Sequence, residues 1–258
     1  MTTNLAIGYL LYVCECVQSI FLFEILISFE QVVVMKKSVI LPSKTFSSKI
    51  CFSLMAMLSL LLVSSDIFAE TSNRVTQGIV AEYDFSEGSG SIVSDVSGIE
   101  PLIDLSIDNL SGVEWKECGG LSVTAPTLIS NSSPASKIID RTKLSEAITL
   151  EAWVIPENIS QTGPARIMTL SNGAYERNFT LGQNANAFQV RLRTTTAGVN
   201  GTNIYVESAA GTAMSTTEPN HVVYTRAADG LAKLYVNGSL TVSKIVNGTF
   251  ADWDTTMQ

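Results

Sequence analysis

Three acidic residues at short spacing are the first candidates for chemistry. Glu82, Asp84 and Glu87 follow the pattern E-x-D-x-x-E. A bulged strand can aim such acids into a cleft, and retaining glycoside hydrolysis uses two carboxyl groups about 5–5.5 Å apart. However, Glu87 begins the turn-like sequence Glu-Gly-Ser-Gly, and Ser86 stands where a strand would prefer an apolar residue. We therefore predict no catalytic residues here, and keep a hydrolase that uses Glu82 and Glu87 as the less favoured alternative.

The remaining reactive residues exclude two further kinds of site. A Ser-His-Asp triad would have to use His221, the single histidine, and the chain has no G-x-S-x-G nucleophile turn. One histidine, with Cys118 the only cysteine after residue 51, cannot supply a tetrahedral zinc site. Calcium stays open because carboxylates and turn carbonyls suffice for it. Its weak candidates are Asp84 and Asp95, whose alternative role is to cap turns.

A set of polar and aromatic side chains could line one face of a sheet. Planar amides, carboxylates and guanidinium groups beside aromatic rings are the groups that usually hold sugars. The alternative is a half-solvated sheet face with cross-strand ion pairs, such as Glu151 with an arginine. The candidates for a ligand face are Glu151, Trp153, Gln189, Arg191, Arg193 and Tyr205.

The stretch Ile148–Ile155 must be a central strand that positions these groups. Its residues alternate, so that Ile148, Leu150, Ala152 and Val154 would share one buried aliphatic face. The opposite face is too apolar for open solvent and too polar for a dry core, which suits a strand in a two-sheet sandwich. Pro156 cannot donate to a ladder, so pairing should end there.

From Gly78 onward the chain shows short alternating segments separated by Gly and Asn turns, which is typical of an all-β sandwich. Asn237-Gly238 predicts a type I′ hairpin turn. Residues 137–144 are expected to form an irregular or one-turn helical bridge. The other expected strands span 79–85, 92–96, 102–107, 120–123, 166–171, 179–182, 188–195, 203–208, 221–226, 231–236 and 239–242.

Five of these segments, in order and spacing, resemble the laminin-G-like jelly roll of the concanavalin A-like lectin/glucanase superfamily. They are Val80–Gly90, Asp95–Gly98, Thr149–Val154, His221–Arg226 and Lys233–Gly238. The resemblance covers residues 77–258 and implies two packed antiparallel sheets. It also implies a binding or spacer role in secreted or surface proteins. The E-x-D-x-x-E letters match the β-glucanase branch of the same superfamily.

We accordingly expect a non-catalytic module that binds an extracellular glycan or protein surface. The alternative is a structural spacer of a larger surface protein. Because similar domains usually continue past a Trp-Asp such as Trp253-Asp254, we expect the domain to be incomplete at its C-terminus, with further domains possible downstream. The strand at 79–85 should then have an unpaired flank, and Val80 or Phe85 should be poorly covered.

The N-terminal region predicts export. Met35 begins a segment with four lysines, an uncharged apolar run and Ala69 before Glu70, which together fit a cleaved signal peptide over residues 35–69. A retained anchor is the alternative, and membrane contact is expected only through this leader. Residues 1–34 are interpreted as a doubtful extension and 70–76 as a linker. The formal net charge of −8 argues against a nucleic-acid partner.

Overall fold

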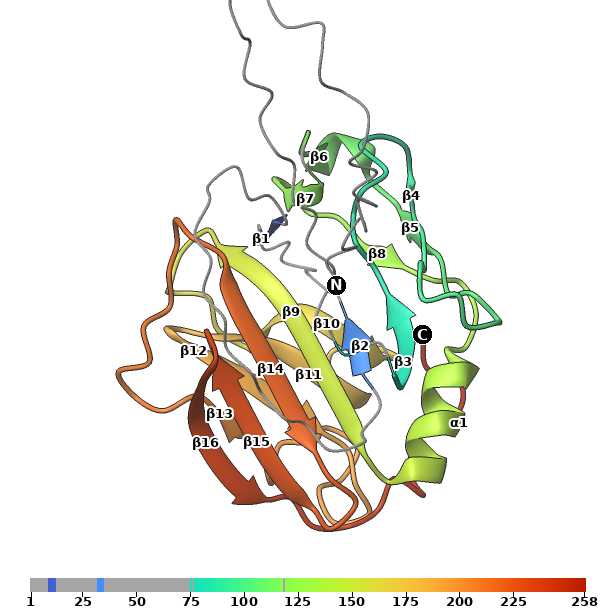
Figure 1. The fold of residues 1–258 in the computed structure, drawn as a ribbon, viewed down its shortest axis with the longest axis vertical. Helices are drawn as coiled ribbons and strands as arrows, with labels where there is room; N and C mark the ends of the chain where they lie inside the picture. The colour runs from blue at the N-terminus through green and yellow to red at the C-terminus, as the bar shows by residue number, and fades with distance from the viewer. Residues whose placement is uncertain (1–8, 13–31, 35–74, 76, 118) are drawn as a thin grey trace, which may run out of the picture.

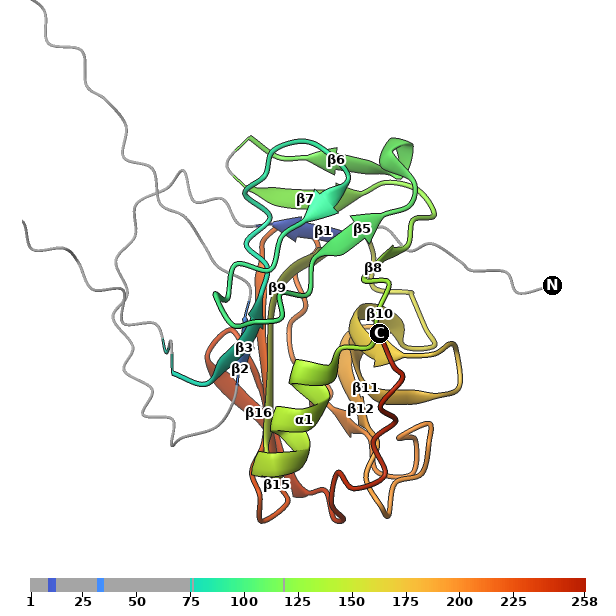
Figure 2. The same ribbon diagram turned by 90° about the vertical axis from the view of Figure 1, so that its right-hand side faces the viewer.

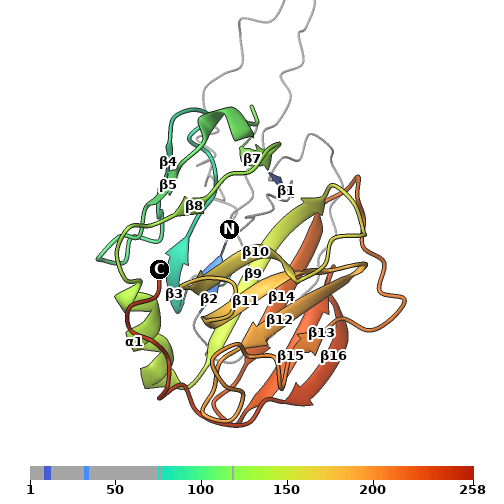
Figure 3. The same cartoon turned by 180° about the vertical axis from the view of Figure 1, so that it is seen from behind.

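The computed structural model describes residues 9–12, 32–34, 75, 77–117 and 119–258 of the chain. Within these ranges the fold is an all-β jelly-roll sandwich with one α-helix. Figure 1 shows one sheet in front of the other, and Figure 3 shows the same two sheets from behind. The expected fold class is therefore confirmed, with the helix as an addition.

The front sheet is built around β9 (Ile148–Pro156), as the alternation of that stretch predicts. Its side-by-side order is β16-β15-β14-β9-β1-β7-β6, and β2 lies between β9 and β3. These strands are β1 (Tyr9–Tyr12), β2 (Val32–Val34), β3 (Ile79–Glu82), β6 (Val113–Trp115), β7 (Gly120–Val123), β14 (Asn220–Arg226), β15 (Leu231–Val236) and β16 (Ser239–Ile245).

The second sheet has the order β10-β11-β12-β13 and packs against the first, as the side view in Figure 2 shows. All of its neighbouring strands are antiparallel. Its strands are β10 (Ala165–Ser171), β11 (Arg177–Asn184), β12 (Ala187–Leu192) and β13 (Val206–Glu207). A small third sheet joins β4 (Ile92–Val93), β5 (Leu105–Ile107) and β8 (Ile129–Ser130), and a 3-10 turn spans Leu110–Gly112.

The core lies between the two large sheets. From β9 it takes Leu150, Ala152 and Val154, each 0% exposed, and from β11 and β12 it takes Leu181 and Phe188. Alternation leaves the other side chains of each strand on the two outer faces of the sandwich. The molecule therefore has two outer sheet faces that could carry a site.

The helix α1 (Ser136–Ser145) corrects the expectation of an irregular or one-turn bridge. It has ten residues and ends where Glu146 adopts a left-handed conformation with φ 52°. Ala135 at its N-terminus makes no capping bond through its side chain, so the usual start signal is missing. Leu144 is 86% exposed, which further blurs the apolar pattern of the helix.

The strand β3 is shorter than expected because it stops at Glu82, and Phe85 has a positive φ of 50° that breaks extended geometry. It pairs in parallel with β2, and no second strand in the described ranges pairs with it. Val80 is 3% and Phe85 is 2% exposed, so the expectation that they would be poorly covered is wrong.

The predicted signal peptide at residues 35–69 lies outside the described residues. Of the predicted extension 1–34 the structure describes β1 and β2, and of the linker 70–76 it describes Val75. Across the described part of the chain, no helix combines the length and the apolar character needed to span a membrane.

Candidate functional site

The outer face of β9 and β14 carries a compact cluster of three side chains. The register pairs Trp153 directly with His221, and their rings stack with centroids 4.2 Å apart and planes at 11°. His221 Nε2 lies 2.8 Å from Glu151 Oε1. Trp153 also packs against Ile79 of β3. The cluster therefore holds itself together, and His221 covers one face of the indole ring.

The outer face of the second sheet carries a hydrogen-bonded row of polar side chains. Glu207 Oε2 accepts bonds from Asn184 Nδ2 at 2.9 Å and from Gln189 Nε2 at 2.5 Å. Gln189 Oε1 in turn accepts a bond from Arg191 Nε at 2.8 Å. We call Asn184, Gln189, Arg191 and Glu207 the polar row. It alternates amides with charged groups on strands β11, β12 and β13.

Tyr205 lies next to the polar row, immediately before β13. It is 44% exposed, and Lys244 Nζ lies 5.9 Å from its ring centroid while donating to its backbone oxygen at 2.7 Å. Burial lowers the pKa of Arg191, while the neighbouring Glu207 and Tyr205 act in the opposite direction. An exposed aromatic ring thus flanks the amide, carboxylate and guanidinium groups.

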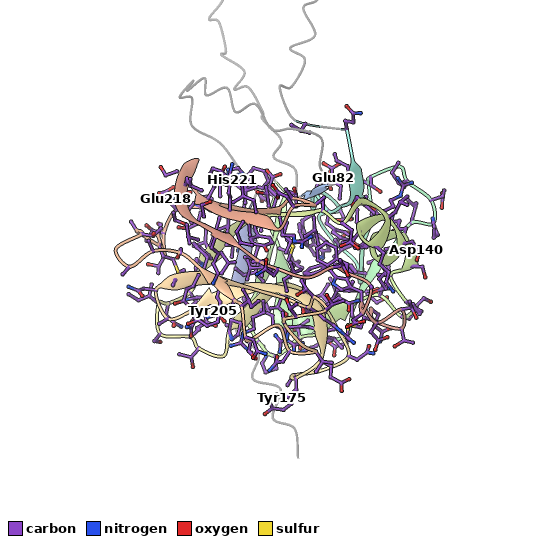
Figure 4. The ribbon with its side chains drawn as sticks, turned by 90° about the horizontal axis from the view of Figure 1, so that it is seen from below. Glu82, Asp140, Tyr175, Tyr205, Glu218 and His221 are labelled. Atoms are coloured by element: carbon purple, nitrogen blue, oxygen red, sulfur yellow. The ribbon has the colours of Figure 1, made fainter. Side chains whose placement is uncertain are left out.

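The six residues expected to share one ligand face are divided between the two outer faces. Glu151 and Trp153 lie on β9 in the first sheet, whereas Gln189, Arg191 and Tyr205 gather at the second sheet. Figure 4 shows His221 on one side of the molecule and Tyr205 on the other. The expected single face is corrected because alternation within a strand does not tell which sheet the strand joins.

Arg193 directly follows the end of β12, and no hydrogen bond among the described residues joins its side chain to the row. Its backbone oxygen accepts a bond from Trp253 Nε1 at 2.8 Å, and its backbone N–H donates to Asn178 at 2.8 Å. Trp253 is buried and packs against Phe179 and Phe250. The described contacts of Arg193 are therefore mainly structural.

The chain was compared with protein families, curated proteins and solved structures. Residues 131–258, from just before α1 to the last residue, match the family described as the concanavalin A-like lectin/glucanases superfamily. This part of the chain is a concanavalin A-like lectin/glucanase domain. Neither the search of curated proteins nor the search of solved structures found a match.

The matched region of the lectin/glucanase domain contains both outer faces just described, with α1 and β9 to β16. It also contains three of the five segments on which the resemblance rests. The first two, Val80–Gly90 and Asp95–Gly98, precede it. The match supports carbohydrate binding at the level of the superfamily, which includes both binding modules and glycosidases.

The acids of the E-x-D-x-x-E pattern precede the matched region and are not presented together on one strand. Only Glu82 lies in β3, where it is 9% exposed. Asp84 accepts bonds from the backbone and hydroxyl of Ser86, and Glu87 accepts a 2.7 Å bond from the backbone of Ser94. These contacts give Asp84 and Glu87 turn-stabilising roles, which is the interpretation that the sequence favoured.

The calcium candidates Asp84 and Asp95 also have protein partners. The side chain of Asp95 is fully buried, and its Oδ2 lies 2.5 Å from Lys137 Nζ. Among the described residues, no group of three or more His, Cys, Asp or Glu side chains is placed to hold a metal ion. Calcium at these positions is therefore not supported.

Two members of the polar row, Asn184 and Glu207, escaped prediction from the sequence. Asn184 lies at the end of β11, next to the turn in which Ala185 has φ 52°. Glu207 belongs to a strand of only two residues. The available signal was the hairpin itself, because Asn184 and Ala187 face each other across it and place Asn184 on the same face as Gln189.

Proposed function

We propose that this protein is a non-catalytic carbohydrate-binding protein whose binding surface is the outer face of β10 to β13. The observation that carries the proposal is the polar row, in which each side chain fixes the next by a hydrogen bond. A ligand meeting such a row finds its hydrogen-bonding groups already oriented, which lowers the ordering cost of binding.

The chemistry of the row suits sugar hydroxyls. Within the described residues the side chain of Arg191 donates only from its Nε, which leaves its two terminal nitrogens to donate to a ligand. Glu207 and Asn184 add an acceptor and a donor, while the buried Gln189 holds Glu207 and Arg191 in place. The exposed ring of Tyr205 offers a surface for the apolar face of a sugar. Membership of the superfamily supports the same class of ligand.

A binding role is favoured over hydrolysis by the number of carboxylates. Both mechanisms of glycoside hydrolysis use a pair of carboxyl groups on either side of the scissile bond. The polar row contains one carboxylate, Glu207, and that group is engaged by two amides. Asp84 and Glu87 are bonded to turn backbone elsewhere.

The full chain applied to a glycan array tests the proposal. Binding should fall at least about tenfold in Gln189→Ala and Glu207→Gln, because each change removes one fixed partner of the row. Glu218→Gln, on an exposed loop residue, is the matched control and should bind like the wild type. Wild-type binding with unchanged affinity in both row variants would place the surface elsewhere. Failure to bind any glycan would favour the spacer role.

We also propose that the domain acts outside the cytoplasm, supported by the lysine-rich start at Met35 and the apolar run before Glu70. N-terminal sequencing of the protein recovered from the medium or envelope should begin at or near Glu70. A recovered protein with residues 1–34 still attached would contradict this proposal.

A further inference from the structure

Three arginines gather on the same outer face as the polar row. In the register of the second sheet, Thr180 faces Arg191 on one side and Thr169 on the other. Arg177 donates from its Nη1 to Thr180 Oγ1 at 3.1 Å, which brings its guanidinium group to this point. Arg166 of β10 reaches the adjacent loop and donates to Ser171 Oγ at 3.2 Å.

Arg177 is the buried member of this arginine cluster. It is 2% exposed, and its Nε has no hydrogen-bond partner in the described structure. Burial, together with the charges of Arg166 and Arg191, lowers the pKa of Arg177 to about 10. The group therefore remains protonated at neutral pH. A buried cation surrounded by two further cations is costly unless a negative charge compensates it.

Within the described residues, no carboxylate forms an ion pair with an arginine of the cluster. The ion pairs found there involve Lys116, Lys137, His221 and Arg226, and none involves an arginine of the cluster. Glu207 lies on the same face, where Asn184 and Gln189 bond to it. Its charge favours the protonated form of Arg191, so it compensates one of the three positive charges in part and leaves those of Arg166 and Arg177. The chain carries 24 acidic residues, so the lack of a partner does not reflect a shortage of acids.

A purely structural role explains only part of this arrangement. Arg177 donates to the backbone oxygen of Ala174, and Arg166 donates to that of Gly173, so both hold the loop between β10 and β11. Neutral donors would serve that purpose at lower electrostatic cost. The convergence of three like charges beside a polar binding row calls for an anion from outside the chain.

We propose that Arg166, Arg177 and Arg191 form an anion subsite that takes the carboxylate or sulfate group of an acidic polysaccharide. This inference rests on the proposed function, since the subsite is part of the same face. Arg166 and Arg191 are half-buried and contact the anionic group, while Arg177 adds its charge from beneath. Guanidinium groups suit both anions because they donate two parallel hydrogen bonds.

The loop between β10 and β11 adds an aromatic ring at the rim of the subsite. Tyr175 is 77% exposed and adjoins Ala174, which Arg177 holds. Figure 4 shows Tyr175 and Tyr205 on the side of the molecule opposite His221. The subsite, the polar row and the two tyrosines together define an elongated surface for several sugar units.

Matched pairs of polymers test the inference with the full chain. The pairs are polygalacturonate against its methyl ester, and dextran sulfate against dextran, so that the two arms separate carboxylate from sulfate recognition. We expect at least about tenfold tighter binding to the charged member of one pair, and weaker binding as NaCl is raised. Arg166→Gln and Arg191→Gln should remove most of this preference, whereas the corresponding lysine variants should keep part of it.

The control is Arg141→Gln, which removes one exposed arginine from α1 and should leave the preference unchanged. Equal binding to charged and neutral polymers would overturn the inference while leaving the proposed function standing. Binding to neither, in a protein that melts cooperatively, would overturn both. An equal loss in the Arg141 control would show nonspecific charge attraction and would also overturn the inference. If a glutamine variant fails to fold, the polymer preference and salt dependence of the wild type still test whether the face binds an anion.

Discussion

The buried pair of Asp95 and Lys137 offers a sharp test of how the N-terminal segment is held to the helix. Their side chains are 0% and 3% exposed, and they join the loop after β4 to α1. Asp95 also accepts backbone bonds from Glu82 and Ser97 through Oδ1 and from Ile103 through Oδ2, at 3.0 to 3.1 Å. One carboxylate therefore ties three chain segments to the helix.

Removing either Asp95 or Lys137 alone should lower the free energy of unfolding much more than removing a surface ion pair. Lys137→Met leaves a buried carboxylate without its counter-charge, and Asp95→Asn leaves a buried ammonium, so each should cost about 3–5 kcal/mol. The double variant contains neither charge and keeps an amide oxygen for some of the backbone donors. Its loss in free energy of unfolding should be about 2–3 kcal/mol smaller than the sum of the losses in the two single variants.

Urea unfolding of the full chain and the three variants measures these differences by linear extrapolation. Lys116→Met, which removes a partly exposed lysine paired with Glu114, is the control and should cost less than about 1 kcal/mol. Single-variant costs below about 1 kcal/mol, or strictly additive costs in the double variant, would refute the reasoning.

Three further predictions follow from burial and geometry. Burial would raise the pKa of Asp95, but bonds from Lys137, Ser97 and Ile103 outweigh it and lower the pKa below the ordinary value of 3.8. The free energy of unfolding of the wild type should therefore exceed that of Asp95→Asn by its full amount above pH 3.8, and this difference should shrink as the pH falls further. Gly182→Ala should destabilise by about 1–3 kcal/mol in thermal melts, because its Cβ would lie 2.4 Å from the backbone oxygen of Ala165; an unchanged melting temperature would contradict the packing. Trp153→Ala should lower stability by about 2–3 kcal/mol and leave glycan affinity unchanged, because the ring packs on Ile79 and His221; lost binding with intact stability would reverse this assignment.

The parts of the fold that were predicted correctly depend on local signals. β9 spans Ile148–Pro156, as alternation and the following proline require. The hairpin between β15 and β16 turns at Asn237 and Gly238, whose φ angles of 51° and 76° match a type I′ turn. In both cases the residue types themselves select the backbone geometry, so a single sequence suffices.

The parts that were missed depend on contacts between distant segments. α1 begins without a capping side chain, and its Lys137 is buried only because Asp95, 42 residues earlier, supplies the counter-charge. β3 stops early because Phe85 turns into the core with a positive φ and its backbone oxygen accepts a bond from Gly120. Tertiary packing overrides local preference at these places.

The division of the predicted ligand face separates side chains that satisfy one another from charged side chains that do not. Glu151, Trp153 and His221 are suitable for binding sugars, yet they satisfy one another by a hydrogen bond and a ring stack. On the opposite face, Arg166, Arg177 and Arg191 have the same sign of charge, and none forms an ion pair within the described residues. With Glu207 as the carboxylate beside them, the three arginines leave this face with a surplus of positive charge, which the anionic ligand proposed above would compensate. This asymmetry arises from the pairing of β10, β11 and β12, because the strand order brings together arginines that are 11 to 25 positions apart in the chain.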